Sequence, residues 1–173
     1  MILSFKKVFA LTVIAVLLSA ISVYGIHVIT STKVAVVPTS STRSLTLELT
    51  LTLDKTEFEL GEPVNITISL KNISNQTVTE KFPTHQVLGY IVEDENGTHV
   101  FSAYYDLGHL MVQTVITLNP GEEFSRTYVW TQVTYSEILR ANVDVPRGTY
   151  KIYGATSECN PRLITPPIDI IIK

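Results

Sequence analysis

Residues 45–53 of the chain read Leu-Thr-Leu-Glu-Leu-Thr-Leu-Thr-Leu, and residues 64–71 read Val-Asn-Ile-Thr-Ile-Ser-Leu-Lys. In both stretches an apolar side chain alternates with a polar one. Because successive side chains of a β-strand point to opposite faces, this period of two predicts strands with one buried and one solvated face. Each apolar face must be covered by another sheet, so the two stretches together predict a β-sandwich.

Further short segments of this kind follow along the chain, separated by turn residues. Asn96-Gly97 favours a type I′ turn and predicts a hairpin in which residues 90–94 pair with residues 99–104. Beyond the N-terminal part of the chain, residues 136–141 are the one segment that we consider as a helix. We expect the other strands at residues 77–82, 87–93, 112–118, 123–132, 149–156 and 168–172. This spacing predicts an all-β fold, an immunoglobulin-like antiparallel β-sandwich of about 7–9 strands.

The N-terminal part of the chain has the features of an export signal. Lys6 and Lys7 precede residues 8–23, which carry no charge; such lysines stay in the cytoplasm while the apolar run enters the bilayer. Residues 8–23 alone fit a cleaved signal peptide, whereas residues 24–29 extend the run to the length of about 20 residues that a spanning helix needs. We favour one N-terminal apolar helix that anchors the chain in the cell membrane, with secretion after cleavage as the alternative.

The chain therefore divides into three parts. Residues 1–29 are the signal anchor or signal peptide, and residues 30–44 are rich in Ser and Thr, which is typical of a tether. Residues 45–173 form the β-sandwich domain, which the anchor would place outside the cell.

Charge and cysteine content exclude several classes of protein. The net charge is −3 and the 13 Lys and Arg residues form no cluster, so we expect no nucleic-acid partner. Cys159 is the only cysteine and cannot form an internal disulfide, so the domain must be stable through packing alone.

No catalytic or metal-binding pattern is visible. His85, His99 and His109 lie far apart in sequence and form no zinc-ligand spacing. Neither a nucleophile motif nor a glycine-rich phosphate loop occurs, so we expect no enzyme, no metal and no cofactor.

Several short motifs follow one another along residues 45–172. They are Asn72-Ile73-Ser74-Asn75, Tyr90-Ile91-Val92-Glu93-Asp94-Glu95-Asn96-Gly97, Leu118-Asn119-Pro120-Gly121-Glu122, Tyr128-Val129-Trp130 and Val145-Pro146-Arg147-Gly148-Thr149-Tyr150. Their order and spacing resemble BsuPI-type domains, a family named after an intracellular proteinase inhibitor of Bacillus. The resemblance implies an immunoglobulin-like scaffold and, for function, proteinase inhibition, but it marks no inhibitory residue. Trp130 is expected to be the central core aromatic, with an indole N–H that needs a partner.

Four Asn-x-Ser/Thr sequons suggest glycosylation of an exported domain. They begin at Asn65, Asn72, Asn75 and Asn96. The alternative is that these Asn and Thr residues simply serve the turns and strands.

Two segments that read as loops hold apolar or aromatic residues and are candidates for partner binding, since such loops lie at the ends of a sandwich. The residues are Tyr104, Tyr105, Leu107, His109, Leu110 and Met111 in the first segment, and Tyr135, Ile138 and Leu139 in the second, residues 133–144. The alternative is that both segments tuck under the sandwich as additional core.

These observations lead to one main hypothesis and two alternatives. The main hypothesis is a non-catalytic, membrane-tethered extracellular module that binds another protein, an envelope protein or a protease, or organises the cell surface. The first alternative is an extracytoplasmic proteinase inhibitor of the BsuPI type, which inserts one loop into a protease cleft. The second is an accessory subunit of a membrane complex, in which the N-terminal helix makes the specific contact.

Overall fold

The computed structural model describes residues 36–104, 112–136, 138–157 and 162–173. The chain divides into two compact units, Met1–Val36 and Val37–Lys173, and the fold below is that of the second. The N-terminal helix expected within residues 1–29 lies outside the described residues. In the part of the chain that is described, no helix is long and apolar enough to cross a membrane.

One sheet has four antiparallel strands. Its order is β1 (Thr39–Arg43), β2 (Leu47–Leu53), β4 (Val64–Asn72) and β9 (Glu123–Trp130). The alternating residues of β2 and β4 pair directly, with Leu51 opposite Ile68. Every leucine of β2 is buried and the residues between them are half-buried, as the period of two predicts.

The second sheet has five strands. Its order is β3 (Glu57–Phe58), β13 (Ile168–Ile172), β12 (Gly148–Thr156), β6 (Leu88–Asp94) and β7 (His99–Ser102). All neighbours are antiparallel except the short pair of β3 with β13.

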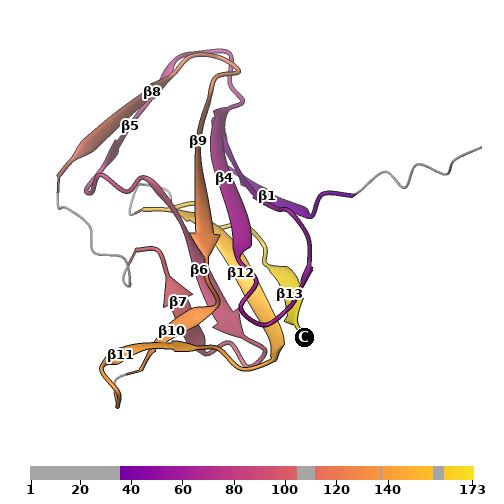
Figure 1. The fold of residues 1–173 in the computed structure, drawn as a ribbon. Coiled ribbons are helices and arrows are strands. Elements are labelled where there is room, and N and C mark those ends of the chain that lie inside the picture. The colour runs from indigo at the N-terminus through magenta and orange to yellow at the C-terminus, as the bar shows by residue number, and fades with distance from the viewer. Residues whose placement is uncertain (1–35, 105–111, 137, 158–161) are drawn as a thin grey trace, which may run out of the picture. The chain divides into compact units, whose positions relative to one another are not determined.

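Two further two-stranded sheets complete the unit. β5 (Val78–Phe82) pairs with β8 (Thr114–Leu118), and β10 (Val133–Ser136) pairs with β11 (Ala141–Asp144). Figure 1 shows the β5–β8 ladder standing away from the two larger sheets, whereas β10 lies beside β7 at the edge of the second sheet. The helix considered at residues 136–141 is wrong, because the chain there closes the β10–β11 turn. The described residues contain thirteen strands, more than predicted, because short ladders carry little periodic signal.

The core lies between the two larger sheets. Leu49, Leu51 and Ile68 from the first sheet, and Val92 and Ile152 from the second, have no exposed surface. These side chains come from the facing strands β2, β4, β6 and β12, which are also in contact (Figure 1). The all-β prediction and the β-sandwich are therefore confirmed.

The first sheet begins earlier than the sequence predicts. Strand β1 lies within residues 30–44, for which the sequence predicts a tether, and it pairs with β2 from Thr39 opposite Thr52 to Arg43 opposite Glu48. Its side chains are Ser, Thr and Arg, so no apolar alternation marks it. Leu45, predicted as the first inward residue of β2, is instead 98% exposed in the turn between β1 and β2.

The hairpin of β6 and β7 is confirmed, but its turn type is wrong. A type I′ turn needs two residues with positive φ. Here Gly97 has a φ of 79°, and Asn96 is not among the non-glycine residues with positive φ in the described chain. Instead, Gly97 N donates to Asp94 O at 3.0 Å, and the Asp94 carboxylate accepts from the backbone N–H groups of Asn96 and Thr98 at 2.9 and 2.8 Å. The Asp94 side chain therefore organises the turn.

Candidate functional site

The second candidate segment is a β-hairpin and not the loop that the sequence predicts. Val133 pairs with Asp144 at its base, and Ser136 pairs with Ala141 next to its turn. Val, Thr and Tyr in β10 have high β-propensity, which favours the strand. The turn returns through Arg140, whose φ of 50° is unusual for a residue with a side chain.

The tip of this hairpin exposes apolar side chains. Ile138 is 93% exposed, Leu139 is 67% exposed and Tyr135 is 47% exposed. Leu139 N donates to the hydroxyl of Ser136 at 3.3 Å, which ties the turn to the end of β10. We call Tyr135, Ile138, Leu139 and Arg140 the tip.

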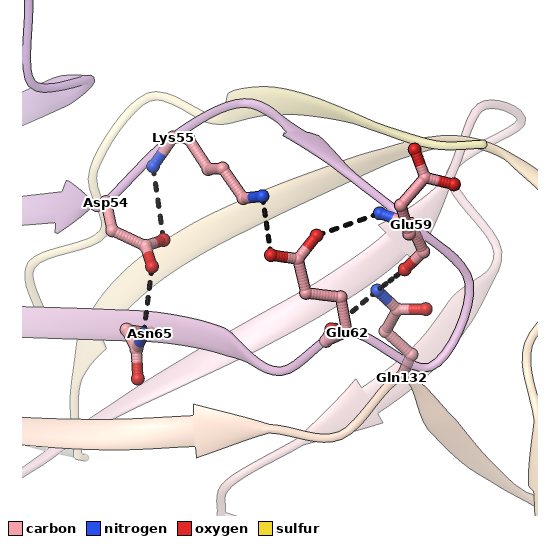
Figure 2. Close-up of polar contacts among 6 residues, drawn as sticks. All are labelled: Asp54, Lys55, Glu59, Glu62, Asn65 and Gln132. Atoms are coloured by element: carbon pink, nitrogen blue, oxygen red, sulfur yellow. Dashed lines mark hydrogen bonds and ion pairs between the residues drawn. The ribbon is translucent and has the colours of Figure 1, made fainter. Parts of the chain in front are cut away.

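The base of the hairpin is held by one buried amide. Gln132, between β9 and β10, is 1% exposed and has a φ of 58°. Its Nε2 donates to the carbonyl oxygens of Glu59 and Glu62 at 2.9 and 2.7 Å (Figure 2). Its Oε1 accepts from Gly61 N at 2.8 Å. Its backbone oxygen accepts from Val145 N at 2.9 Å, just after β11. Gln132 thus joins both ends of the hairpin to the segment between β3 and β4.

That segment is fixed by its own polar contacts. The Glu62 carboxylate accepts from Lys55 Nζ at 2.6 Å and from Glu59 N at 3.0 Å (Figure 2). The hydrogen bond from Lys55, followed by that from the Glu59 N–H, lowers the pKa of Glu62 below its ordinary value. The segment that receives the Gln132 amide thus also has polar contacts of its own.

Two further side chains fix β10 to the sandwich. Trp130, 1% exposed, donates its indole N–H to Val133 O at 3.0 Å and packs edge-on against Tyr150 with ring centroids 5.9 Å apart. Thr134 donates its hydroxyl to Val100 O in β7 at 2.6 Å. The predictions that Trp130 is a core aromatic and that its N–H has a partner are both confirmed.

The β10–β11 hairpin can bind another protein through its exposed tip. It presents aliphatic, phenol and guanidinium groups on a short hairpin whose base makes side-chain hydrogen bonds to three other segments. An element that is ordered before binding loses little conformational freedom on binding, and exposed apolar residues at its tip can fill a pocket in a partner.

A family model described as "Intracellular proteinase inhibitor", BsuPI, matches residues 51–159. The chain belongs to the BsuPI family. The resemblance that the motifs suggested is confirmed, and the matched region contains the whole β10–β11 hairpin together with Gln132 and Trp130.

The other similarities of this BsuPI-family chain to known proteins are distant. No curated protein matches it. A mutant β-glucosidase from Listeria innocua in complex with laminaribiose is 18% identical with a TM-score of 0.46, covering 76% of this chain and 16% of that one. A β-glucosidase from Erythrobacter marinus is 9% identical with a TM-score of 0.42, covering 79% of this chain and 16% of that one. The chain thus spans about a sixth of the length of these enzymes.

Of the first candidate segment, the structure describes only Tyr104. Tyr104 is 7% exposed, and its hydroxyl donates to Ala155 O in β12. Its ring covers Gly89 so closely that a Cβ there would lie 2.6 Å from it. Tyr104 is therefore a core residue. Tyr105, Leu107, His109, Leu110 and Met111 lie outside the described residues.

The four sequon asparagines differ in their surroundings. Asn75 and Asn96 are exposed, and Asn65 is exposed with its amide donating to Asp54 at 2.8 Å. Asn72 has no exposed surface, and its amide donates to Gln76 O and Leu118 O at 2.7 and 2.9 Å. The Asn72 amide therefore serves the fold, and a glycan on it would replace a hydrogen that makes one of these bonds.

The described residues hold no group of three or more His, Cys, Asp or Glu side chains that could bind a metal ion. His85 and His99 lie on different segments, and His109 is outside the described residues.

Sequence reasoning found the tip but missed Gln132. Tyr135, Ile138 and Leu139 stand out because they are apolar residues in a segment without periodicity. Gln132 carries no such signal, because its role depends on backbone atoms about 70 residues earlier in the chain.

Proposed function

We propose that the chain is a proteinase inhibitor whose β10–β11 hairpin enters a cleft of its target. Membership of the BsuPI family supports inhibition as the activity and a protease as the partner. The observation that carries the choice of the hairpin is its exposed apolar tip on a base fixed by Gln132. An inhibitor of this kind needs no catalytic group of its own.

The energetics of the tip suit this role. Burying an aliphatic side chain on binding contributes about 1.5–3 kcal/mol, and Ile138 and Leu139 are both available for burial. The gain is not consumed by ordering a loop, because the hairpin is already formed in the free chain.

We infer that the sandwich is of the immunoglobulin type. Strands β2, β4 and β9 form one sheet and β13, β12 and β6 the other, which is the order of the A, B, E and G, F, C strands of that fold. In this scheme the hairpin β10–β11 is an insertion between the E and F strands, at one end of the sandwich.

We also propose that the domain acts outside the cytoplasm, tethered by the N-terminal segment. Lys6 and Lys7 before the uncharged run of residues 8–23 support export. Exposed Asn65, Asn75 and Asn96 are the sites that glycosylation would use there. Alkaline phosphatase fused after Lys173 should be active in cells, and an inactive, stable fusion would exclude this location.

The function is tested by titrating subtilisin, papain and thermolysin with the full chain. We expect tight, saturable inhibition of at least one of these proteinases. If none is inhibited while the chain captures a defined envelope protein, the inhibitor proposal fails and the broader hypothesis of a cell-surface binding module replaces it.

A further inference from the structure

We propose that the hairpin blocks its proteinase as a wedge and is not bound like a substrate, so the chain is not cleaved at the tip. This inference rests on the proposed function. It concerns the manner of inhibition and the part of the target that is recognised, which is an apolar depression in the cleft.

The backbone of the tip has the wrong shape for a substrate. A proteinase binds the residues around a scissile bond as an extended strand, in which every residue has negative φ. Arg140 has a φ of 50°, and Ser136 pairs with Ala141 directly beside the turn. The described residues between this pair, Ile138, Leu139 and Arg140, form a turn and present no extended stretch.

Opening the turn would disrupt contacts beyond it. Six extended residues span about 20 Å, whereas paired residues of an antiparallel ladder have Cα atoms about 5 Å apart. Threading the tip would therefore separate Ser136 from Ala141 and then Tyr135 from Asn142. Further opening is opposed by the hydrogen bonds that hold Val133 O and Thr134 to Trp130 and Val100.

The tip can nevertheless bind while it stays closed. Ile138 and Leu139 project from the turn with most of their surface free, and their contact requires only an apolar pocket of matching size. The Arg140 side chain beside them is exposed and favours acidic groups at the rim of that pocket. The recognised partner is thus a proteinase with an apolar pocket in its cleft. Recognition does not depend on which catalytic nucleophile the proteinase uses.

A reversible cross-link across the hairpin tests the inference. Ser136→Cys and Ala141→Cys are introduced together with Cys159→Ser, because the paired positions have the Cα separation that a disulfide needs. The inhibition constant is measured for the oxidised and reduced forms against the proteinase that the unmodified chain inhibits most strongly. We expect the two constants to agree within about threefold.

The outcomes separate the two proposals. If the reduced form inhibits and the oxidised form does not, the wedge is wrong and the hairpin must open to bind. If neither the unmodified chain nor the reduced variant inhibits any proteinase, the proposed function itself fails. Should the variant not fold, the mass of the unmodified chain after prolonged incubation with the proteinase decides: an intact chain supports the wedge, and a cut within residues 136–141 overturns it.

Discussion

Gln132 is the residue on which the position of the hairpin depends most. A glutamine side chain can both donate and accept, and here it satisfies two carbonyls and one N–H of the turn after β3. The left-handed backbone of Gln132 directs its side chain there. The strain of that conformation is offset by the bonds that it permits.

Replacing Gln132 by leucine should therefore destabilise the domain. Gln132→Leu leaves Glu59 O, Glu62 O and Gly61 N without their partner, and we expect a loss of about 2–4 kcal/mol in the free energy of unfolding. Urea denaturation measures it. The matched control is Gln113→Leu at an exposed position, which should change stability by less than about 0.5 kcal/mol. Equal stability of the two variants would show that the amide does not hold the base.

Glu62 makes the stability of the same turn depend on pH. The hydrogen bond from Lys55, followed by that from the Glu59 N–H, lowers the pKa of Glu62 in the folded chain. A lowered folded-state pKa stabilises the fold above the unfolded pKa of about 4.3 and loses that contribution as the pH falls through the folded value.

We therefore expect Glu62→Gln to be less stable than the unmodified chain at pH 7, with the difference shrinking below about pH 4. Chemical denaturation at pH 7 and pH 3 measures this. In a Lys55→Met background the pH dependence of the difference should become smaller, because the largest cause of the shift is gone. A difference that is the same at both pH values would contradict the assignment.

Among the elements, the turn between β6 and β7 shows how a side chain can set a hairpin. The Asp94 carboxylate accepts two backbone N–H groups, and the bond from Thr98, then that from Asn96, lowers its pKa. Only an acceptor at this position is needed, so a neutral amide should suffice.

We expect Asp94→Ala to lower the free energy of unfolding, because two backbone N–H groups of the turn lose their acceptor. Asp94→Asn keeps an oxygen at the same place and should lose less than half of that. Thermal or urea unfolding of both variants checks the order. If Asn is as damaging as Ala, the carboxylate oxygen is not what organises the turn.

The strands that sequence reasoning predicts correctly are those with a strong period. Residues 47–53 and 64–70 face a single core, so the alternation of Leu and Ile with Thr and Ser is imposed by burial. Strand β1 is an edge strand with both faces polar, and its position depends on backbone pairing with β2, which leaves no trace in composition. The sequence does not predict the hairpin β10–β11 because each of its strands has only four residues, too few to show a period.

The candidate site was predicted in part. Exposed Ile138 and Leu139 could be identified because apolar residues without periodicity are unusual. Tyr104 has the same appearance in the sequence, yet it is buried, because the space over Gly89 accepts its ring. Local sequence does not reveal which apolar residue finds such a space, since the space is made by a strand elsewhere in the chain.

For the whole molecule, stability comes from the contact between the two sheets. With a single cysteine the chain has no internal disulfide, so buried Leu and Ile residues must supply the stabilisation. Leu51 is fully buried and would lie 3.2 Å from a Cβ on Gly154 of the facing sheet, which shows how closely the sheets approach there.

Leu51→Ala should cost about 2–5 kcal/mol of unfolding free energy, because it leaves a cavity between the sheets. Its neighbour Thr50 points to the other face, and Thr50→Ala should cost about 1 kcal/mol or less. Urea denaturation compares the two. Similar losses at both positions would mean that the alternation does not separate core from surface.

The central claim is that the tip of the β10–β11 hairpin carries inhibition, and the inhibition constant of a tip variant tests it most directly. The double change Ile138→Ser and Leu139→Ser removes the apolar contact without touching the base. Leu45→Ser, at 98% exposure in the turn between β1 and β2, is the matched control. We expect the tip variant to inhibit at least about 100-fold more weakly, since the two lost side chains contribute about 3–6 kcal/mol together, while the control and the unfolding free energies stay unchanged. A tip variant that inhibits as well as the unmodified chain would show that the tip does not carry inhibition.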